Sequence, residues 1–267
     1  MKEVTNIVSE TAVSIDKIRE NIKFNSLKYK EIDQLDDFRE HVPIAIVGGG
    51  PSLNDTYIEL YDFNPRRIMA CGSVHDFLVE KGIIPRWCVV VDPDPVILGY
   101  IKYPRKETKY LVSSQCDPEI FEYLKDYDVT LWHAYGDALG TDSFNKNSIL
   151  IGGGCTVGTR AIIIAAGFGY NVIHLYGIDS CLTDDYKHHA YNFIDSKKET
   201  VGNITEIRLD YSDSPTFKVA DYMLAQLFDF KSILQTYSKR LKFISHGNGL
   251  ITYLLKISQE KAMKNGN

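Results

Sequence analysis

The sequence predicts an α/β fold of the Rossmann-like, doubly wound type, with a mostly parallel sheet and an N-terminal helical appendage. From residue 43 onward, short runs of apolar, β-branched residues alternate with stretches of helical character. Glycine-rich or polar residues follow six of these runs, as expected where parallel strands end at one crevice. A length of 267 residues, 44% of them hydrophobic, suffices for one main domain with a sizeable core.

Residues 1–41 form the predicted appendage. They are rich in charged and amide side chains, and their apolar residues are spaced as in one or two amphipathic helices. These residues are Val13, Ile15, Ile18, Ile22 and Leu27. Residues 42–267 form the predicted nucleotide-binding domain, and the N-terminal helices offer it a surface for homo-oligomer formation.

Eight short apolar runs within the main domain read as buried strands. They cover residues 44–47, 67–71, 87–91, 109–113, 129–133, 148–151, 172–176 and 241–245. Helices over 217–237 and from about residue 250 complete the predicted pattern. Periodicity is lost between 179 and 215, and so long an irregular segment inside a compact domain is typically functional. We expect residues 180–215 to form a lid over the crevice.

The first glycine-rich turn, Gly48-Gly49-Gly50-Pro51-Ser52, follows a strand and precedes a helix. Glycines let backbone N–H groups approach an anion, which the positive end of a helix attracts. The alternative is a tight turn without a ligand. A Walker cradle is excluded because GxxxxGK[ST] is absent, and a dinucleotide fingerprint would need a third glycine where Leu53 stands. An NAD-dependent dehydrogenase is therefore not expected.

A second strand, glycine turn and helix follow at Gly152-Gly153-Gly154, with Thr156 near the helix start. Two such turns at one crevice would hold both ends of a ligand. Close packing of the helix on the sheet through small residues explains the pattern equally well.

Two groups of side chains suggest chemistry at the crevice. Asp92 and Asp94 emerge at a strand end, where they suit a Mg²⁺ or Mn²⁺ bound to a nucleotide diphosphate, or simply cap a proline-rich turn. Asp179 ends another strand, and His188 and His189 follow in the predicted lid. A histidine there can act as a general base toward a hydroxyl, although adjacent loop histidines are often exposed and inert.

Net charge, cysteine content and apolar runs restrict the functional class and the location expected for the protein. A formal charge of −5 and a pI near 5.8 argue against general nucleic-acid binding. Five cysteines without a CxxC pair indicate reduced thiols and hence the cytoplasm. The polar N-terminal segment has no apolar stretch like that of a signal peptide, and no apolar run approaches the length that spans a bilayer, so we expect neither export nor membrane insertion.

The segments IVGGGPSL, ACGS, GIIPRWCVVVDPD, GGGCTVG, GFGYNVIHLYGID and KHHAY together resemble the MptE-like superfamily. That group includes archaeal 6-hydroxymethylpterin pyrophosphokinases and the central domain of the Maf flagellin-glycosylation factors. GGGPSL and GYNVIHLYGID also look like bacterial sialyltransferases of the CMP-sialic-acid type. The resemblance spans about residues 43 to 250.

The resemblance implies a nucleotide donor, either a nucleotide sugar or ATP, and a hydroxyl acceptor. By this resemblance, 48–52 hold donor phosphate and Asp179 lies near the ribose or the acceptor. His188 or His189 matches a lid histidine that serves as general base in sialyltransferases. The residues that would line the nucleotide are Cys71, Gly72, Ser73, Gly153, Gly154 and Thr156.

The chain departs from the sialyltransferase pattern in two places. Sialyltransferases have Asn where Gly49 stands, and they do not use a metal pair where Asp92 and Asp94 stand. These carboxylates suit a metal-assisted diphosphate chemistry instead. The first hypothesis is therefore a nucleotide-dependent, glycosyltransferase-like enzyme. The alternatives are a Mg²⁺-dependent pyrophosphokinase that uses ATP and a non-catalytic ligand-binding or assembly module.

Overall fold

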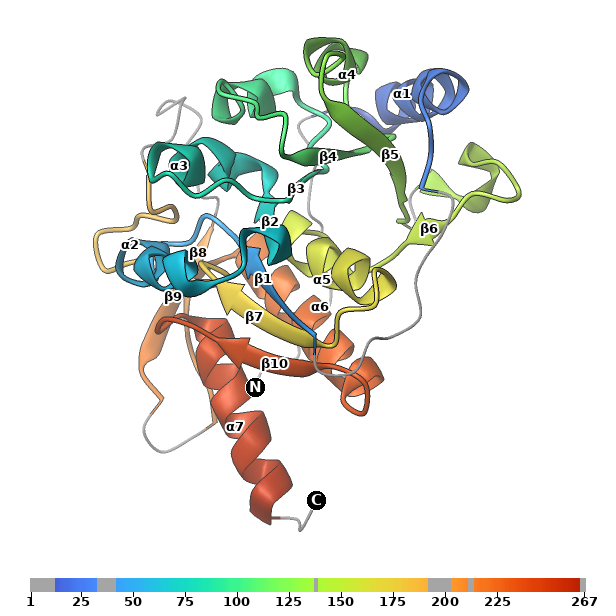
Figure 1. The fold of residues 1–267 in the computed structure, drawn as a ribbon. Coiled ribbons are helices and arrows are strands. Elements are labelled where there is room, and N and C mark those ends of the chain that lie inside the picture. The colour runs from blue at the N-terminus through green and yellow to red at the C-terminus, as the bar shows by residue number, and fades with distance from the viewer. Residues whose placement is uncertain (1–12, 33–41, 137–138, 192–202, 211–213, 265–267) are drawn as a thin grey trace.

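The computed structural model describes residues 13–32, 42–136, 139–191, 203–210 and 214–264. Eight strands form its central sheet: β1 Pro43–Val47, β2 Ile68–Cys71, β3 Trp87–Val90, β4 Lys109–Ser113, β5 Asp128–Ala134, β6 Leu150–Ile151, β7 Val172–Tyr176 and β10 Lys242–Ser245. All pairs are parallel, in the order β10-β7-β1-β2-β3-β4-β5-β6 (Figure 1). The eight predicted strands are confirmed, with bounds that differ by no more than two residues.

Helices cover both faces of this sheet, which confirms the doubly wound arrangement. The longer ones, α5 Val157–Gly167, α6 Asp221–Tyr237 and α7 Leu250–Lys264, pack on the face that Ile44 and Ile46 of β1 also bury. The other face carries α2 Leu53–Thr56, α3 His75–Glu80, α4 Pro118–Tyr123 and several 3-10 turns. Within the described residues, no helix is long and apolar enough to cross a membrane.

The strand order places a topological switch between β1 and β7. From β1 the chain adds strands in one direction as far as β6, then returns through α5 to lay β7 along the opposite side of β1. Val47 pairs with Tyr176 at the carboxyl ends of these two strands. The turns that follow them are therefore neighbours, at the point where open α/β sheets bind ligands.

The helix α1 Ile15–Lys28 belongs to the predicted appendage and docks on the loop after β4. Ile18 and Ile22 are buried, and the buried amides of Asn21 and Asn25 donate to backbone carbonyls of residues 114–116. The remainder of the predicted appendage, 1–12 and 33–41, lies outside the described residues.

The segment expected to be irregular contains the strand β8 Ile204–Arg208, which forms an antiparallel ribbon with β9 Thr216–Ala220 just beyond it. α6 begins directly after β9, so the helix predicted from 217 starts four residues later. The alternation of buried Phe217 and Val219 favours a strand, but β8 is exposed almost throughout and gives little pattern. Parts of the predicted lid, 192–202 and 211–213, lie outside the described residues.

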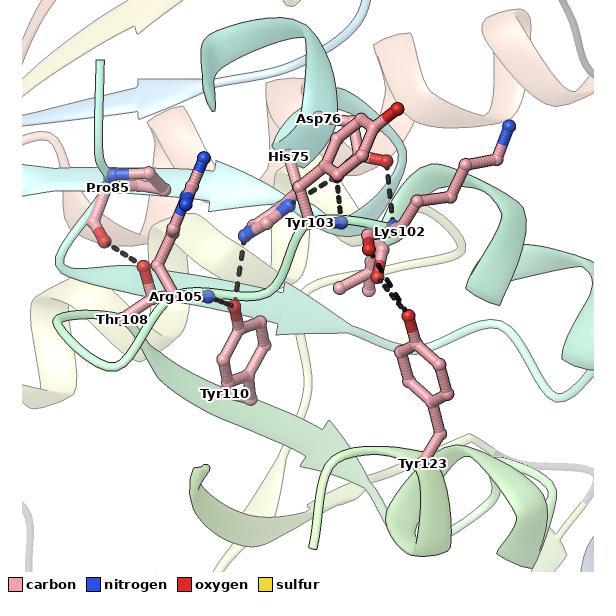
Figure 2. A network of polar contacts seen from close by, with 10 residues as sticks. His75, Asp76, Pro85, Lys102, Tyr103, Arg105, Thr108, Tyr110 and Tyr123 are labelled. Atoms are coloured by element: carbon pink, nitrogen blue, oxygen red, sulfur yellow. Dashed lines mark hydrogen bonds and ion pairs between the residues drawn. The ribbon is translucent and has the colours of Figure 1, made fainter. Parts of the chain in front are cut away.

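A buried polar network braces the loop that leads into β4 (Figure 2). His75 Nδ1 lies 2.9 Å from Asp76 Oδ1, and its Nε2 lies 3.1 Å from the Tyr110 hydroxyl, which accepts from Arg105 N–H. Because a carboxylate only accepts, Nδ1 carries a hydrogen and donates it to Asp76. Both ring nitrogens have a polar partner, so His75 is a structural residue of the core.

Candidate functional site

The turn after β1 packs directly against the turn after β7. Gly48 N–H donates to Tyr176 O and Gly50 N–H donates to Gly177 O, each at 2.8 Å. A Cβ added to Gly48 would lie 2.6 Å from Gly177 O, and one added to Gly50 would lie 2.5 Å from the Asp179 carboxylate. Glycine is therefore required at both positions by this close approach.

Asp179 fixes the shape of the first turn. Its Oδ2 accepts from Ser52 N–H at 2.8 Å and its Oδ1 accepts from Ser52 Oγ at 2.6 Å. Burial raises the pKa of Asp179, and the two bonds from Ser52 offset part of that rise. Ser52 consequently does not cap α2, which has only four residues and a small dipole. The predicted attraction of phosphate to this helix end is weak.

A cavity of about 160 Å³ opens at the carboxyl ends of β1, β2 and β7, and we call it the central cavity. It gathers many of the residues that the sequence indicated. These are Gly48, Gly49, Gly50, Cys71, Ser73, Thr156, Asp179, His188 and His189. Its lining also includes Val157, Gly158, Gly177, Ile178, Ser180, Cys181, Tyr222, Met223 and Gln226. Pro51, Ser52 and Gly72 are not part of its lining.

The N-terminus of α5 opens into the central cavity. Thr156 caps this 11-residue helix, accepting from Thr159 N–H, and receives a 2.9 Å bond from Gln226 Nε2 of α6. Gln226 in turn accepts from Ser180 Oγ. Ser180 has a φ of 52°, in the left-handed region that non-glycine residues rarely adopt. The first N–H groups and the dipole of α5 favour an anion in this part of the cavity.

Sequence reasoning missed Ser180, Tyr222, Met223 and Gln226. Three of them lie on α6, more than 60 residues along the chain from the α5 turn that they face. No local pattern marks them, because their place in the cavity depends on how α6 docks on the sheet.

The two histidines lie side by side at the mouth of the central cavity. Gly49 O accepts from Ala190 N–H at 2.9 Å and lies 3.2 Å from His189 Nδ1. Since a carbonyl only accepts, the ring hydrogen is on Nδ1 and Nε2 carries the lone pair. Desolvation, followed by the neighbouring His188, lowers the pKa of His189 to about 4. His189, stacked on Tyr191, is therefore neutral at physiological pH.

The cavity thiols are not nucleophiles. Burial raises the pKa of Cys71 to about 12 and that of Cys181 to about 11, so both thiols stay protonated near neutral pH. The cavity therefore offers imidazole and backbone groups for chemistry, rather than a thiolate.

Gly153 and Gly154, predicted to line the nucleotide, lie outside the central cavity. Both have positive φ, 106° and 99°, and a Cβ on Gly154 would overlap the Asp229 carboxylate. That carboxylate accepts from Cys155 N–H at 2.7 Å. The two glycines let the loop after β6 turn tightly against α6.

Asp92 and Asp94 form part of a capped turn. Asp92 Oδ1 accepts from Asp94 N–H, and Asp94 Oδ1 accepts from Val96 N–H, each at 2.9 Å. Neither residue lines the central cavity, and the described part of the chain contains no group of three His, Cys, Asp or Glu residues suited to a metal. Among the described residues the pair has no third protein ligand, so a metal ion held there would need its remaining ligands from substrate or water.

A family model described as 6-hydroxymethylpterin diphosphokinase MptE-like matches residues 16–185, more than half of the chain. The match begins in α1 and includes both turns that meet at the central cavity. Among functionally curated proteins, no significant match to the sequence was found.

The MAf glycosyltransferase from Magnetospirillum magneticum AMB-1 superposes on 90% of this chain with a TM-score of 0.65 and 20% sequence identity. The chain spans 38% of that longer protein. This similarity shows a shared fold. The sialyltransferase CstII from Campylobacter jejuni, solved with the substrate analogue cytidine-5'-monophosphate, matches at a TM-score of 0.36 and 14% identity, over 80% of this chain and 84% of CstII.

Proposed function

Because the chain belongs to the 6-hydroxymethylpterin diphosphokinase MptE-like family, we propose that it is a transferase that binds a nucleotide-linked donor in the central cavity. The observation that carries this proposal is the convergence of the first glycine turn, the α5 N-terminus and two histidines on one cavity at the strand switch point.

The charge of the cavity favours a donor with a single phosphate, such as a CMP-linked sugar. Its described lining contains no lysine or arginine, so backbone N–H groups at the start of α5 supply most of the positive potential. One phosphodiester carries one negative charge, whereas a triphosphate brings several that would need side-chain cations or a metal. We therefore place the phosphate against Thr156, Val157 and Gly158.

His189 is the proposed general base. Its neutral ring accepts the proton of the acceptor hydroxyl at Nε2, while the hydroxyl oxygen forms a bond to the sugar carbon and the bond from that carbon to the donor phosphate breaks. The nucleotide monophosphate leaves with its electron pair. Asp179 acts as a positioning residue, since both of its oxygens hold Ser52. Residues 180–191 serve as the first part of the lid, which Ala190 N–H fastens to Gly49 O.

The donor site is tested by titrating the protein with CMP, UDP, GDP and ATP, with and without Mg²⁺, in a calorimeter. Thr156→Asp keeps a good helix cap but places a negative charge beside the proposed phosphate. Thr156→Asn, whose side chain has the same shape as that of Asp, keeps the cap without the charge. We expect CMP binding to weaken at least about tenfold in the first variant relative to the second. Absence of heat with every nucleotide, or equal affinity of the two variants, contradicts the proposal.

A diphosphokinase that transfers pyrophosphate from ATP to a hydroxymethyl compound is the second candidate, and the family description favours it. Asp92 and Asp94 would then bind a Mg²⁺ together with the substrate phosphates, since each retains one carboxylate oxygen outside the capping bonds. Incubation with ATP, Mg²⁺ and 6-hydroxymethyl-dihydropterin should yield AMP, and Asp92→Asn should abolish it. A glycosyltransferase leaves ATP intact.

We also propose that α1 mediates homo-oligomer formation in the cytoplasm. Leu27 and Phe24 are 83% and 45% exposed on the surface of this helix, an unusual position for two neighbouring large apolar side chains. Light scattering after gel filtration should give a multiple of the 30.3 kDa chain mass, and Leu27→Glu should return the monomer. A monomeric wild type refutes this assignment without affecting the donor site.

A further inference from the structure

A second cavity, of about 370 Å³, lies at the carboxyl end of β6 and is called the lateral cavity here. It forms between the glycine turn after β6 and one face of α6, and it shares no lining residue with the central cavity. Its lining comprises Leu150, Gly152, Gly153, Gly154, Ile163, Asp229, Ser232, Ile233, Thr236 and Tyr237.

The α6 face that lines the lateral cavity is rich in hydroxyl groups. Asp229, Ser232, Ile233, Thr236 and Tyr237 follow a spacing of three and one, which places them on one side of the helix. Three hydroxyls that both donate and accept, a carboxylate and a phenol ring are arranged beside apolar walls. This combination suits a neutral polyhydroxylated ligand, whose hydroxyls need both donors and acceptors and whose carbon faces need apolar contact.

Gly152 gives a second, independent indication of a ligand. The two glycines after it have positive φ, but Gly152 does not, and a Cβ built on it would meet no atom within 4 Å. Neither backbone conformation nor packing requires a glycine at this position. The missing side chain leaves open space in the cavity wall. Glycine has this effect at positions where a ligand approaches the backbone closely.

Neighbouring stretches of the same two chain segments line the two cavities. Residues 156–158 and 222–226 line the central cavity, and the neighbouring residues 152–154 and 229–237 line the lateral one. The stretch of α6 from 222 to 237 is about 22 Å long at the rise of an α-helix, comparable to a short oligosaccharide. A ligand in the lateral cavity can therefore extend toward the donor.

We propose that the lateral cavity binds a carbohydrate, and that this carbohydrate is part of the acceptor. The role as acceptor rests on the proposed glycosyltransfer, whereas carbohydrate binding itself does not. Asp229, Ser232 and Thr236 bind sugar hydroxyls, and Gly152 leaves room for the ring.

Saturation-transfer NMR on the full chain tests the proposal with methyl β-D-galactoside, methyl α-D-glucoside and methyl N-acetyl-β-D-glucosaminide as probes. Ser232 and Thr236 are exposed, so Ser232→Ala with Thr236→Val should fold normally while removing two hydrogen-bonding groups. Gly152→Val fills the open space, and Gln235→Ala, an exposed α6 residue outside the cavity, is the control. We expect at least one glycoside to bind and its affinity to fall roughly tenfold or more in the first two variants only.

Three outcomes overturn the proposal. The first is the absence of a saturation-transfer signal for every glycoside at millimolar concentration. The second is glycoside binding that survives both cavity variants. The third is glycoside binding that CMP displaces, since the glycoside would then occupy the central cavity. If the wild-type protein binds a glycoside but no nucleotide, the proposed donor site is refuted and the carbohydrate site is not. If the glycosides fail and a serine- and threonine-rich peptide binds instead, the cavity recognises a polypeptide acceptor and the carbohydrate assignment is wrong.

Discussion

Acidification should destabilise this protein through His189, by an amount that follows from its surroundings. Desolvation by burial, followed by the neighbouring His188, lowers its pKa from 6.5 in the unfolded chain to about 4 in the folded one, and the hydrogen bond to Gly49 O offsets part of this shift. The unfolded state therefore binds a proton first as the pH falls. The stability that the neutral ring contributes is complete above pH 6.5 and is lost progressively between pH 6.5 and 4.

At about pH 5 this linkage amounts to at most about 2 kcal/mol, because the unfolded imidazole is nearly all protonated while the folded one is mostly neutral. Partial exposure of the ring reduces that figure. Urea unfolding followed by the fluorescence of Trp87 and Trp132 measures it in wild type and His189→Gln at about pH 7.5 and pH 5. Glutamine keeps a donor for Gly49 O and does not titrate in this range.

The quantity to compare is the loss of unfolding free energy on acidification in the two proteins. Burial also lowers the pKa of His133 and His174, but those histidines are present in both proteins and their contributions cancel. We expect a smaller loss in His189→Gln. An equal loss in both proteins would mean that the ring is as well solvated in the folded protein as in the unfolded chain, and the reasoning about its neutral state would fail.

Further predictions concern the turns and their support. Asp179→Asn keeps one acceptor for Ser52 but turns an amide toward its other donor, so it should cost about 1.5–3 kcal/mol in urea unfolding; a loss below about 0.5 kcal/mol contradicts the clamp. Gly152→Ala should be neutral or slightly stabilising in a melting experiment, whereas Gly154→Ala, with positive φ and a clash at α6, should be clearly destabilising. Equal melting temperatures would show that the loop does not turn as described. Gln226→Leu removes the bridge between Ser180 and α5, so CMP affinity should fall about fivefold and the melting temperature should fall as the buried Ser180 hydroxyl loses its partner; unchanged affinity would assign Gln226 no part in the donor site.

The sheet could be predicted from the sequence because its signals are local. Each central strand is a short apolar run followed by turn residues, and burial on both faces removes any need for alternation. β8 was missed because it is exposed almost throughout, so the period-two pattern of a half-buried strand is absent. The start of α6 differs from the prediction because β9, which pairs with β8, occupies the first residues assigned to the helix.

Residue types at strand ends predicted the central cavity only in part. Gly48 to Gly50 and the histidines were indicated by motif, and the structure brings them together. Gly153 and Gly154 look equivalent to the first turn in sequence, but they pack against Asp229 and face the lateral cavity instead. Asp92 and Asp94 similarly hold backbone N–H groups of their own turn.

The sequence by itself determined the fold class, the strand ends and the family, because these depend on composition, periodicity and spacing within short segments. Tertiary structure alone decided the roles within the site. Asp179 became a clamp because β7 returns beside β1, His189 became neutral because the chain folds back over Gly49, and Gln226 joined the cavity because α6 docks on α5. Such contacts join residues far apart in the chain, and their chemistry follows from burial and partners that no local pattern encodes.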